Sequence, residues 1–218
     1  MRAAASAPAL RVSEIFFSLQ GESTRVGLPT VFVRLTGCPL RCTWCDTTHA
    51  FSGGDSRSIT DVLGRVAAYC CKTVCVTGGE PLAQAACPPL LTALCDAGYD
   101  VSLETSGALD IAGVDPRVSR IVDLKAPDSG ECDRNRWENL DLLRPTDELK
   151  IVLASRADYE WAKKSTLAGR QLPCPILFSP VWDRLPPAEL AQWILDDGLP
   201  VRFQLQLHKI LWGDTRGR

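Results

Sequence analysis

The sequence contains no run of apolar residues long enough to span a membrane, so it predicts no transmembrane segment. Positive charge is not in excess. The formal net charge is −2, which argues against a strongly basic surface for duplex nucleic acid. Residues 1–8 lack the apolar centre of a signal peptide. No Pro- or Gly-rich linker and no internal repeat divides the chain. These absences predict a cytoplasmic protein with neither nucleic acid nor a membrane as its partner.

What is present is the composition of an ordinary globular protein. Apolar residues make up 45 % and charged residues 23 % of a 218-residue chain, which is long enough to bury a sizeable core. We therefore predict a single domain over residues 1–218. The sequence leaves open whether residues 1–10 are ordered.

Three of the ten cysteines are concentrated in one short segment. Cys38, Cys42 and Cys45 follow the spacing C-x3-C-x2-C. Because a cytoplasmic chain is not expected to carry a disulfide framework, these thiols are candidate metal ligands. Three thiolates on one loop would hold a 4Fe-4S cluster and leave one of its four irons open to a further ligand.

Two alternatives to a cluster remain open. A structural zinc site could combine these cysteines with His49, the only histidine nearby. The three cysteines could also be unrelated core residues. Five further cysteines fall in apparent helix or strand patterns and are predicted to be small core residues: Cys70, Cys71, Cys75, Cys87 and Cys95.

The order of the predicted elements favours an α/β fold. Apolar, β-rich runs predict strands at residues 30–36, 73–77, 99–104, 120–124, 148–153, 175–179 and 201–206. Helices are predicted at residues 58–71, 88–97, 156–165 and 187–197, the first opened by a capping box at Ser58. Strand–helix alternation indicates a mostly parallel sheet. Because a full eight-unit barrel needs about 250 residues, we predict an incomplete, open β/α barrel.

Unusual residues recur where these strands end. The segments are the cysteine loop, Gly78-Gly79-Glu80-Pro81, Glu104-Thr105-Ser106-Gly107, Asp123-Leu124-Lys125, Ser179-Pro180-Val181-Trp182 and Gln206-Leu207-His208-Lys209. Parallel α/β folds build their sites at the carboxyl ends of strands. Packing alone does not explain six such segments meeting at one edge, so the pattern is typical of an enzyme. Gly78 and Gly79 also permit close approach of a ligand to the backbone.

The cysteine spacing after the first barrel strand and Gly-Gly-Glu-Pro after the second resemble the radical S-adenosylmethionine (radical SAM) superfamily. That resemblance implies a 4Fe-4S cluster on Cys38, Cys42 and Cys45, with SAM on its open iron. It places Trp44 beside the SAM adenine, where shielding of the cluster is the alternative role. The cofactor-binding residues that it implies are Trp44, Cys45, Asp46, Gly79, Glu80, Glu104, Ser106, Asp123, Leu124 and Lys125.

A narrower resemblance covers almost the whole chain. Segments 16–22, 32–38, 45–47, 77–81, 104–107 and 206–209 are similar to those of the 7-carboxy-7-deazaguanine synthase family. This implies conversion of 6-carboxy-5,6,7,8-tetrahydropterin to 7-carboxy-7-deazaguanine with loss of ammonia, on the route to queuosine and related 7-deazapurines. It further implies Mg²⁺, a homodimer, and an external electron donor resembling flavodoxin or ferredoxin.

The same resemblance assigns substrate contacts. The implied pterin-binding residues are Leu19, Gln20, Gly21, Arg34, Thr77 and His208. Arg34 would offer its guanidinium to the substrate carboxylate, and Thr47 would give a hydroxyl to Mg²⁺. No catalytic side chain is assigned, because a SAM-derived radical would initiate the reaction by abstracting hydrogen.

Two segments depart from the patterns common in related chains. Asp123-Leu124 precedes Lys125 where Ser-Pro is frequent, and Leu207 precedes His208 where Thr is frequent. Two rival functions also remain at this stage: a glycyl-radical enzyme activase with the same cysteine spacing, and a non-catalytic zinc-binding module.

Overall fold

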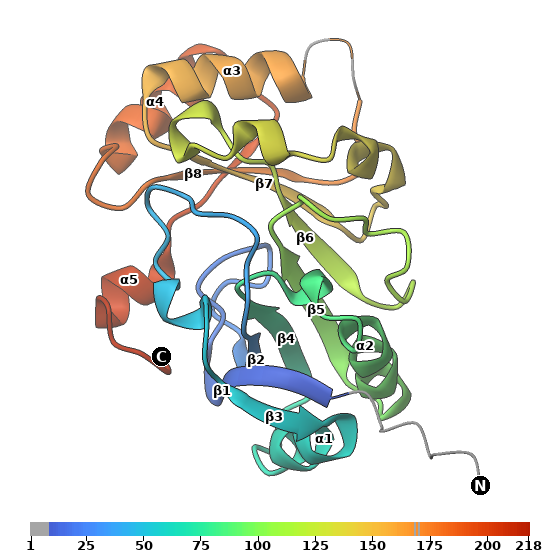
Figure 1. Ribbon diagram of the computed structural model, residues 1–218. Coiled ribbons are helices and arrows are strands. Elements are labelled where there is room, and N and C mark those ends of the chain that lie inside the picture. The colour runs from blue at the N-terminus through green and yellow to red at the C-terminus, as the bar shows by residue number, and fades with distance from the viewer. Residues whose placement is uncertain (1–8, 168, 170) are drawn as a thin grey trace, which may run out of the picture.

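The fold is built on one nine-stranded sheet (Figure 1). The computed structural model describes residues 9–167, 169 and 171–218. The strands are β1 (Ala9–Leu19), β2 (Pro29–Leu35), β3 (Asp55–Ser58), β4 (Thr73–Gly78), β5 (Asp100–Thr105), β6 (Ser119–Asp123), β7 (Glu148–Leu153), β8 (Ile176–Pro180) and β9 (Arg202–Phe203). Their order across the sheet is β3-β1-β2-β4-β5-β6-β7-β8-β9.

The sheet is mostly parallel and curves into an open barrel. From β2 through β4 to β9 each neighbouring pair is parallel, whereas β1 pairs antiparallel with both β2 and β3. Among the described strands, no pairing joins β9 back to β3. The predicted incomplete β/α barrel is therefore confirmed.

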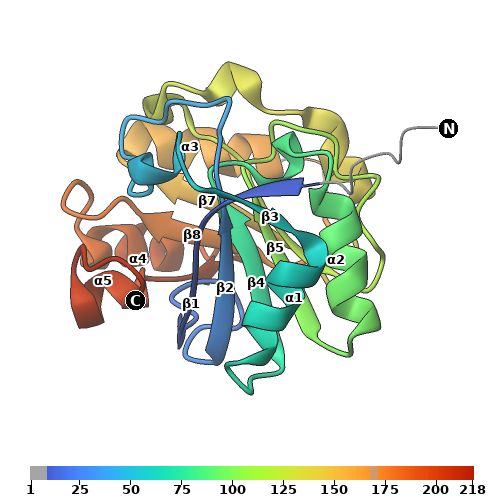
Figure 2. The same ribbon diagram turned by 60° about the horizontal axis from the view of Figure 1, so that its bottom comes forward.

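Helices cover the outer face of the sheet in two groups. Figure 1 shows α1 (Ile59–Ala67) and α2 (Cys87–Asp96) at one end of the curved sheet, and α3 (Arg156–Thr166) and α4 (Pro187–Asp196) at the other. Each group covers its own apolar core. In Figure 1 the short α5 (Leu207–Trp212) lies apart from both groups, and Figure 2 shows it near the C-terminus, to one side of β1. Among the described residues, no helix is long and apolar enough to cross a membrane.

Most predicted elements are present, and the differences have physical causes. The seven predicted strands correspond to β2 and β4–β9, although β9 has only two residues. The helix opened by Ser58 stops at Ala67, and Cys70, expected in the core, is exposed with a positive φ of 51°. Strands β1 and β3 were not predicted. Ala9 and Leu10 pair with β3, so they are ordered, while residues 1–8 lie outside the described part of the chain.

A β-bulge in β1 reverses the alternation of its side chains between the two faces of the sheet. Val12 pairs with Leu35, but Glu14 pairs with the very next residue, Arg34, so Ser13 is the extra residue. Before the bulge, Leu10 and Val12 are buried in the core under α1 and α2. After it, alternation is reversed, and Phe16 packs with Phe32 and Cys75 in a separate cluster inside the barrel. The bulge therefore turns Glu14 toward the barrel interior.

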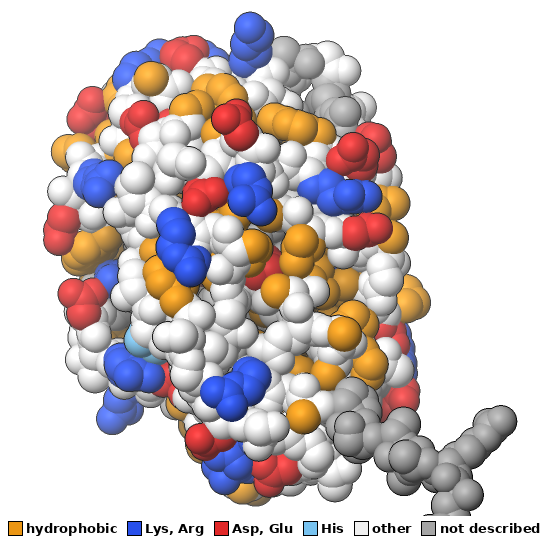
Figure 3. All heavy atoms as spheres, viewed as in Figure 1, with side chains coloured by type: hydrophobic (Ala, Val, Ile, Leu, Met, Phe, Trp, Pro, Cys, Tyr) orange, Lys and Arg blue, Asp and Glu red, His pale blue; other side chains and the backbone are white. Residues whose placement is uncertain are grey.

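The barrel interior carries polar side chains at its carboxyl end. Register pairs place Arg34 beside Thr77, and Asp123 beside Lys150, on the inner face. Glu104 occupies the matching inner position on β5, between them. On the one face of the molecule seen in Figure 3, basic and acidic side chains are interspersed, and neither sign forms a continuous patch. A group of charged side chains lies inside the barrel, at the place where the sequence predicts a site.

Candidate active site

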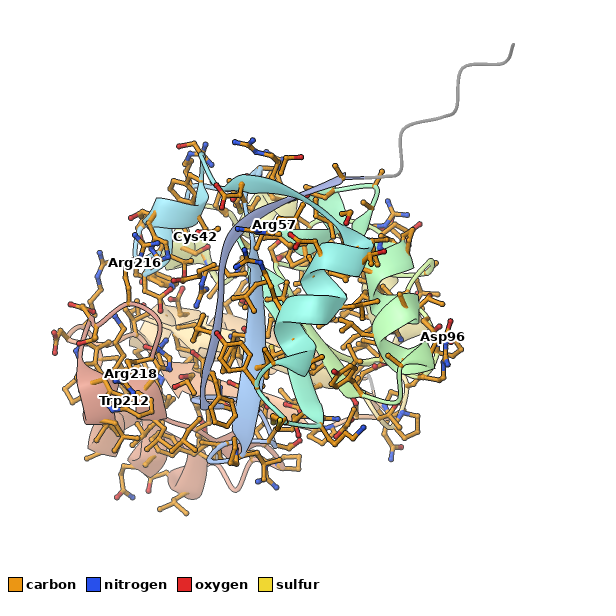
Figure 4. All side chains as sticks on the ribbon, turned by 90° about the horizontal axis from the view of Figure 1, so that it is seen from below. Cys42, Arg57, Asp96, Trp212, Arg216 and Arg218 are labelled. Atoms are coloured by element: carbon orange, nitrogen blue, oxygen red, sulfur yellow. The ribbon has the colours of Figure 1, made fainter. Side chains whose placement is uncertain are left out.

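A cavity of about 650 Å³ opens at the carboxyl ends of the parallel strands. Its wall comes from the cysteine loop, from the ends of β2 and β4–β8, from residues 19–22 and from α5. In Figure 4, Cys42 and the C-terminal Arg216 lie on the same side of the sheet, remote from Asp96 on α2. All predicted site residues line this cavity except Glu80 and Leu124.

The three cysteines face this cavity together. The loop begins after β2 at Gly37, whose φ of 97° favours glycine. Cys38, Cys42 and Cys45 are half-buried, free, and part of the cavity wall. Burial raises the pKa of each thiol, and the Lys125 ammonium acts in the opposite direction on all three. Thiols in this setting become thiolates most readily when a metal binds them.

Backbone hydrogen bonds fasten the cysteine loop to the segment that follows β6. Thr43 N donates to Ser129 O over 3.0 Å, and Thr43 Oγ1 donates to Asp128 O over 3.0 Å. Arg41 N donates to Glu131 Oε1 over 2.5 Å. The buried Asp158 on α3 in turn accepts from Asp128 N over 3.0 Å. The loop is thus held in place before any metal binds.

The arrangement argues against a mononuclear zinc site. Among the described residues, no group of three or more His, Cys, Asp and Glu side chains converges as ligands of one ion. His49 instead lies 3.3 Å from Glu14 Oε1 through its Nε2. Zinc needs four ligands around a single centre. In a 4Fe-4S cluster each cysteine binds a different iron, so spaced thiols on one loop suit the cluster.

The glycine pair after β4 packs directly against the start of the cysteine loop. Gly78 has a φ of 140°, and a Cβ there would lie 2.1 Å from Leu35 O. A Cβ on Gly79 would lie 2.1 Å from Gly37 O and 3.0 Å from Cys38 Cβ. Side chains at either position would separate the two loops. The pair therefore keeps exposed backbone next to the cysteines, as the sequence predicts.

Glu80 does not reach the cavity. Its side chain is fully buried, and its carboxylate accepts from Leu82 N over 2.9 Å and from Thr105 Oγ1 over 2.9 Å. Ser106 donates to the same carboxylate through both its N and its Oγ. The cofactor role predicted for Glu80 stays a prediction, and its side chain is turned away from the cavity. Glu80 instead joins the turn after β4 to the end of β5.

Leu124 is also excluded from the wall. It is buried at 4 % exposure and belongs to the core beneath α3 and α4, because β6 alternates and turns it outward. Its neighbours Asp123 and Lys125 both line the cavity and form an ion pair of 2.6 Å. Burial disfavours the charge on Lys125, but Asp123 outweighs it, so the pKa of Lys125 is raised.

A charged network continues across the cavity floor. Lys150 Nζ lies 2.7 Å from Glu22 Oε2 and 3.2 Å from Asp123 Oδ1. Burial opposes the charge on Lys150, but Asp123 and Glu22 raise its pKa well above the usual value. Burial likewise acts against the Glu22 carboxylate, and Lys150 outweighs it to lower the pKa of Glu22. Both groups therefore remain charged at neutral pH.

Glu104 lines the cavity and is held there by two neighbouring side chains. It accepts from Gln20 Nε2 over 3.1 Å and from Thr77 Oγ1 over 2.8 Å. Ser106, predicted to act near Glu104, is turned toward Glu80 instead. Glu104 therefore groups with the predicted pterin-binding residues rather than with the predicted SAM-binding ones.

The remaining predicted contacts surround Arg34 and His208. Arg34 Nη1 lies 3.5 Å from Thr47 Oγ1, which itself donates to Asp46 Oδ1 over 2.8 Å. Burial acts against the Asp46 carboxylate, but the Thr47 hydrogen bond together with the nearby Lys209, His208 and Arg34 lowers the pKa of Asp46. His208 Nε2 lies 4.0 Å from Asp46 Oδ2. Oxygen donors and cationic groups thus meet beside the cysteine loop.

Comparison with known proteins places the chain in a family. The model of the Radical SAM superfamily matches residues 32–129. A 7-carboxy-7-deazaguanine synthase from Chlorobaculum tepidum is 50 % identical, over 95 % of this chain and 97 % of the relative. One from Koribacter versatilis is 41 % identical, over 95 % of this chain and 100 % of the relative. The chain belongs to the 7-carboxy-7-deazaguanine synthase family.

A solved structure shares the fold. The crystal structure of QueE from Escherichia coli aligns with a TM-score of 0.69 at 23 % identity, covering 92 % of this chain and 95 % of that one. As a member of the 7-carboxy-7-deazaguanine synthase family, the chain is a radical SAM enzyme, whose cofactors are a 4Fe-4S cluster and SAM. The cavity fits both groups, because free thiols and exposed glycine backbone lie side by side in its wall.

Several wall residues of this family member escaped prediction. Glu22 and Gln206 lay inside segments that carried the resemblance, but no role was assigned to them; Gln206 Nε2 donates to Glu22 Oε1 over 2.9 Å. Lys150 lies in an otherwise apolar strand that also carries Glu148, and buried charges in such a run are themselves a signal. Val181 and Trp182 add apolar wall after β8.

Proposed function

We propose that this chain converts 6-carboxy-5,6,7,8-tetrahydropterin to 7-carboxy-7-deazaguanine with loss of ammonia, in 7-deazapurine biosynthesis. One observation supports this most directly. In a chain 50 % identical to a synthase of that name, a single cavity is lined both by three free thiols and by hydrogen-bonding groups suited to a pterin.

The cysteine wall would hold the cofactors. Cys38, Cys42 and Cys45 would bind the cluster, and the backbone at Gly79 would receive the amino end of SAM. Trp44, with Arg184 positioned over its ring at 5.7 Å, and the apolar Val181 would pack beside the adenine. When bound, the two cofactors supply abstraction of a hydrogen atom from substrate.

A second group of cavity residues would recognise the pterin. Arg34 would bind the carboxylate through its Nη groups, since guanidinium presents a planar fork to such anions. Glu104, fixed by Gln20 and Thr77, has the acceptor oxygens that a pterin ring N–H needs. Leu19 and Gly21 would contact the ring, with His208 at its edge.

Thr47 and Asp46 would hold Mg²⁺ beside the substrate. Their two oxygens are joined by a 2.8 Å hydrogen bond, so they are near enough to serve one ion. Mg²⁺ prefers oxygen ligands and keeps several waters. The substrate carboxylate, already directed by Arg34, would complete this site.

The charged floor would fix the position of the substrate and move protons. Lys150 forms ion pairs with both Glu22 and Asp123, so this network costs little reorganisation when the reaction redistributes charge. Loss of ammonia requires proton delivery to a leaving nitrogen. Lys150 is the buried ammonium of this network.

At a coarser level, the chain is a radical SAM enzyme that acts on a small molecule. We propose further that it works as one domain over residues 1–218, in the cytoplasm, as a homodimer. Its reducing electron would come from a carrier resembling flavodoxin or ferredoxin. These proposals follow from the family and from the compact cavity.

The decisive experiment is anaerobic turnover. The reconstituted protein, SAM, Mg²⁺, a reductant and the tetrahydropterin are incubated together, and products are measured by mass spectrometry. We expect 7-carboxy-7-deazaguanine. Formation of 5′-deoxyadenosine without that product would sink the substrate assignment and direct attention to other substrates, including a protein partner.

A further inference from the structure

Glu14 lies behind the cavity wall rather than in it, and nothing in the reaction uses it directly. Its side chain is 18 % exposed, and Oε1 accepts from Arg34 Nε over 2.8 Å. His49 Nε2 lies 3.3 Å from the same oxygen, and Arg216 Nη2 lies 3.8 Å from Oε2. The carboxylate is therefore the common partner of three basic groups, of which Arg34 is the nearest.

The position of Glu14 depends on the bulge at Ser13. Without the extra residue, regular alternation would leave Glu14 on the same face as Leu10 and Val12, inside an apolar core. β-Bulges are found beside active sites because they redirect a side chain. Here the bulge places a carboxylate directly across from Arg34 on the neighbouring strand.

The guanidinium of Arg34 is restrained on several sides. Glu14 takes its Nε, the Phe16 ring lies 5.6 Å from its Cζ, and Thr47 Oγ1 is 3.5 Å from Nη1. A free arginine side chain has large rotamer freedom, which binding would otherwise have to remove. Because Glu14 engages Nε, Nη2 and the weakly engaged Nη1 remain for a ligand in the cavity that Arg34 lines.

We propose that Glu14 is a positioning residue, which fixes the Arg34 guanidinium so that its Nη groups meet the carboxylate of the substrate. The proposal rests on the proposed function, in which Arg34 binds that carboxylate. Glu14 itself touches neither substrate nor cofactor. It acts through Arg34, so its effect is confined to ligands that carry the carboxylate.

The test uses two ligands that differ in one group. 6-Carboxypterin is an oxidised, unreactive form of the substrate, and pterin lacks the carboxylate. Calorimetry measures the affinity of each for the unreduced holoenzyme with Mg²⁺. We expect Glu14→Gln to weaken the binding of 6-carboxypterin by about tenfold, while the affinities for pterin and for SAM change by no more than about twofold. Glu189→Gln, an exposed change on α4, is the charge-matched control.

Two further variants separate positioning from a merely structural role. Arg34→Lys keeps the charge but has no Nε for Glu14 to hold, so it should show the same selective loss. Adding Glu14→Gln to Arg34→Lys should then cause no further weakening. If Glu14→Gln does not fold, Glu14→Asp takes its place, with a smaller loss of the same selectivity expected.

The outcomes distinguish this inference from the function on which it rests. Equal weakening of both pterins by Glu14→Gln, or no change in either, would overturn the positioning role. A wild-type enzyme that binds no carboxypterin and makes no 7-carboxy-7-deazaguanine would overturn the proposed function instead. Turnover by the wild-type enzyme, together with weaker binding of 6-carboxypterin alone in Glu14→Gln, would support both the proposed function and the positioning role.

Discussion

The imidazole of His208 occupies the space in which any other residue at position 21 would carry its side chain. A Cβ on Gly21 would lie 2.2 Å from His208 Nδ1. Leu207 N also donates to Gly21 O over 2.9 Å, which ties the start of α5 to the loop after β1. Gly21 is therefore required for the position of a neighbouring side chain rather than for an unusual backbone angle.

Gly21→Ala should displace the His208 ring without unfolding the protein, because the atoms in the way belong to a side chain. We expect the KM for the tetrahydropterin to rise by about tenfold, or about 1.4 kcal/mol, with little change in the KM for SAM. Steady-state kinetics and thermal unfolding measure this. Gly64→Ala, on the exposed face of α1 with open space around it, is the matched control. An unchanged pterin KM would contradict the contact.

Cys42→Ala should abolish cluster assembly while leaving the apo fold intact, since a half-buried loop thiol contributes little to the core. Iron analysis and visible absorption after anaerobic reconstitution should fall to background, and unfolding of the apo protein should be almost unchanged. Cys70→Ala, at an exposed cysteine outside the cavity, should reconstitute normally. Full iron content in Cys42→Ala would refute the ligand assignment.

Glu131→Gln should loosen the cysteine loop. The carboxylate accepts from Arg41 N over 2.5 Å, and a neutral amide would accept less strongly from that N–H. We expect the reconstituted cluster to lose iron to a chelator several times faster, with global stability lowered by no more than about 1 kcal/mol. Glu138→Gln, at an exposed position further along the chain, is the comparison. Equal rates of iron loss would show that the loop is held by its other contacts alone.

Stability toward acid should depend on Asp147. Burial would raise the pKa of this carboxyl, but hydrogen bonds from Arg120 and Arg144 outweigh it and lower the pKa from 3.8 to about 2. As the pH falls below about 4, the unfolded chain binds a proton that the folded protein does not, so stability falls. The contribution amounts to about 2 kcal/mol at neutral pH.

Urea unfolding between pH 7 and pH 2.5 tests this relationship. Asp147→Asn should be less stable at pH 7 and should lose much of the decline between pH 4 and pH 2.5. Asp133→Asn, at an exposed carboxyl, should keep the wild-type profile. If the free energy of unfolding of Asp147→Asn falls as steeply between pH 4 and pH 2.5 as that of the wild type, other carboxyls cause the loss of stability in acid.

Most of the parallel strands could be predicted because they are short runs rich in apolar and β-branched residues. Strand β1 could not be predicted in this way. The bulge at Ser13 breaks its alternation, so neither a period of two nor a continuous run is visible across residues 9–19. Strand β3 is four polar residues at a sheet edge, and such a segment has no hydrophobic pattern.

Site residues could be predicted where a motif fixes the position of the backbone. They were harder to predict where the direction of a side chain depends on contacts with other strands. Gly79 and the three cysteines line the cavity as expected. Glu80 follows the glycine pair, but its direction depends on Thr105 and Ser106, which lie on another strand. Glu14 and Lys150 required knowledge of strand register. The places of these two side chains depend on ion pairs with residues on other elements, and the sequence alone does not show which residues pair.

The contact between residues 22 and 206 joins positions 184 apart in the chain. By contrast, the cysteine loop and the glycine pair that packs against it both lie within the first 80 residues. Contacts between distant parts of a chain form slowly, because a long loop must close before they are made. During synthesis from the N-terminus, the ligands of the cluster can therefore gather while the ribosome still holds the last strands. The pterin wall cannot form until α5 has emerged. A nascent chain would thus be competent to receive iron before it can bind its substrate.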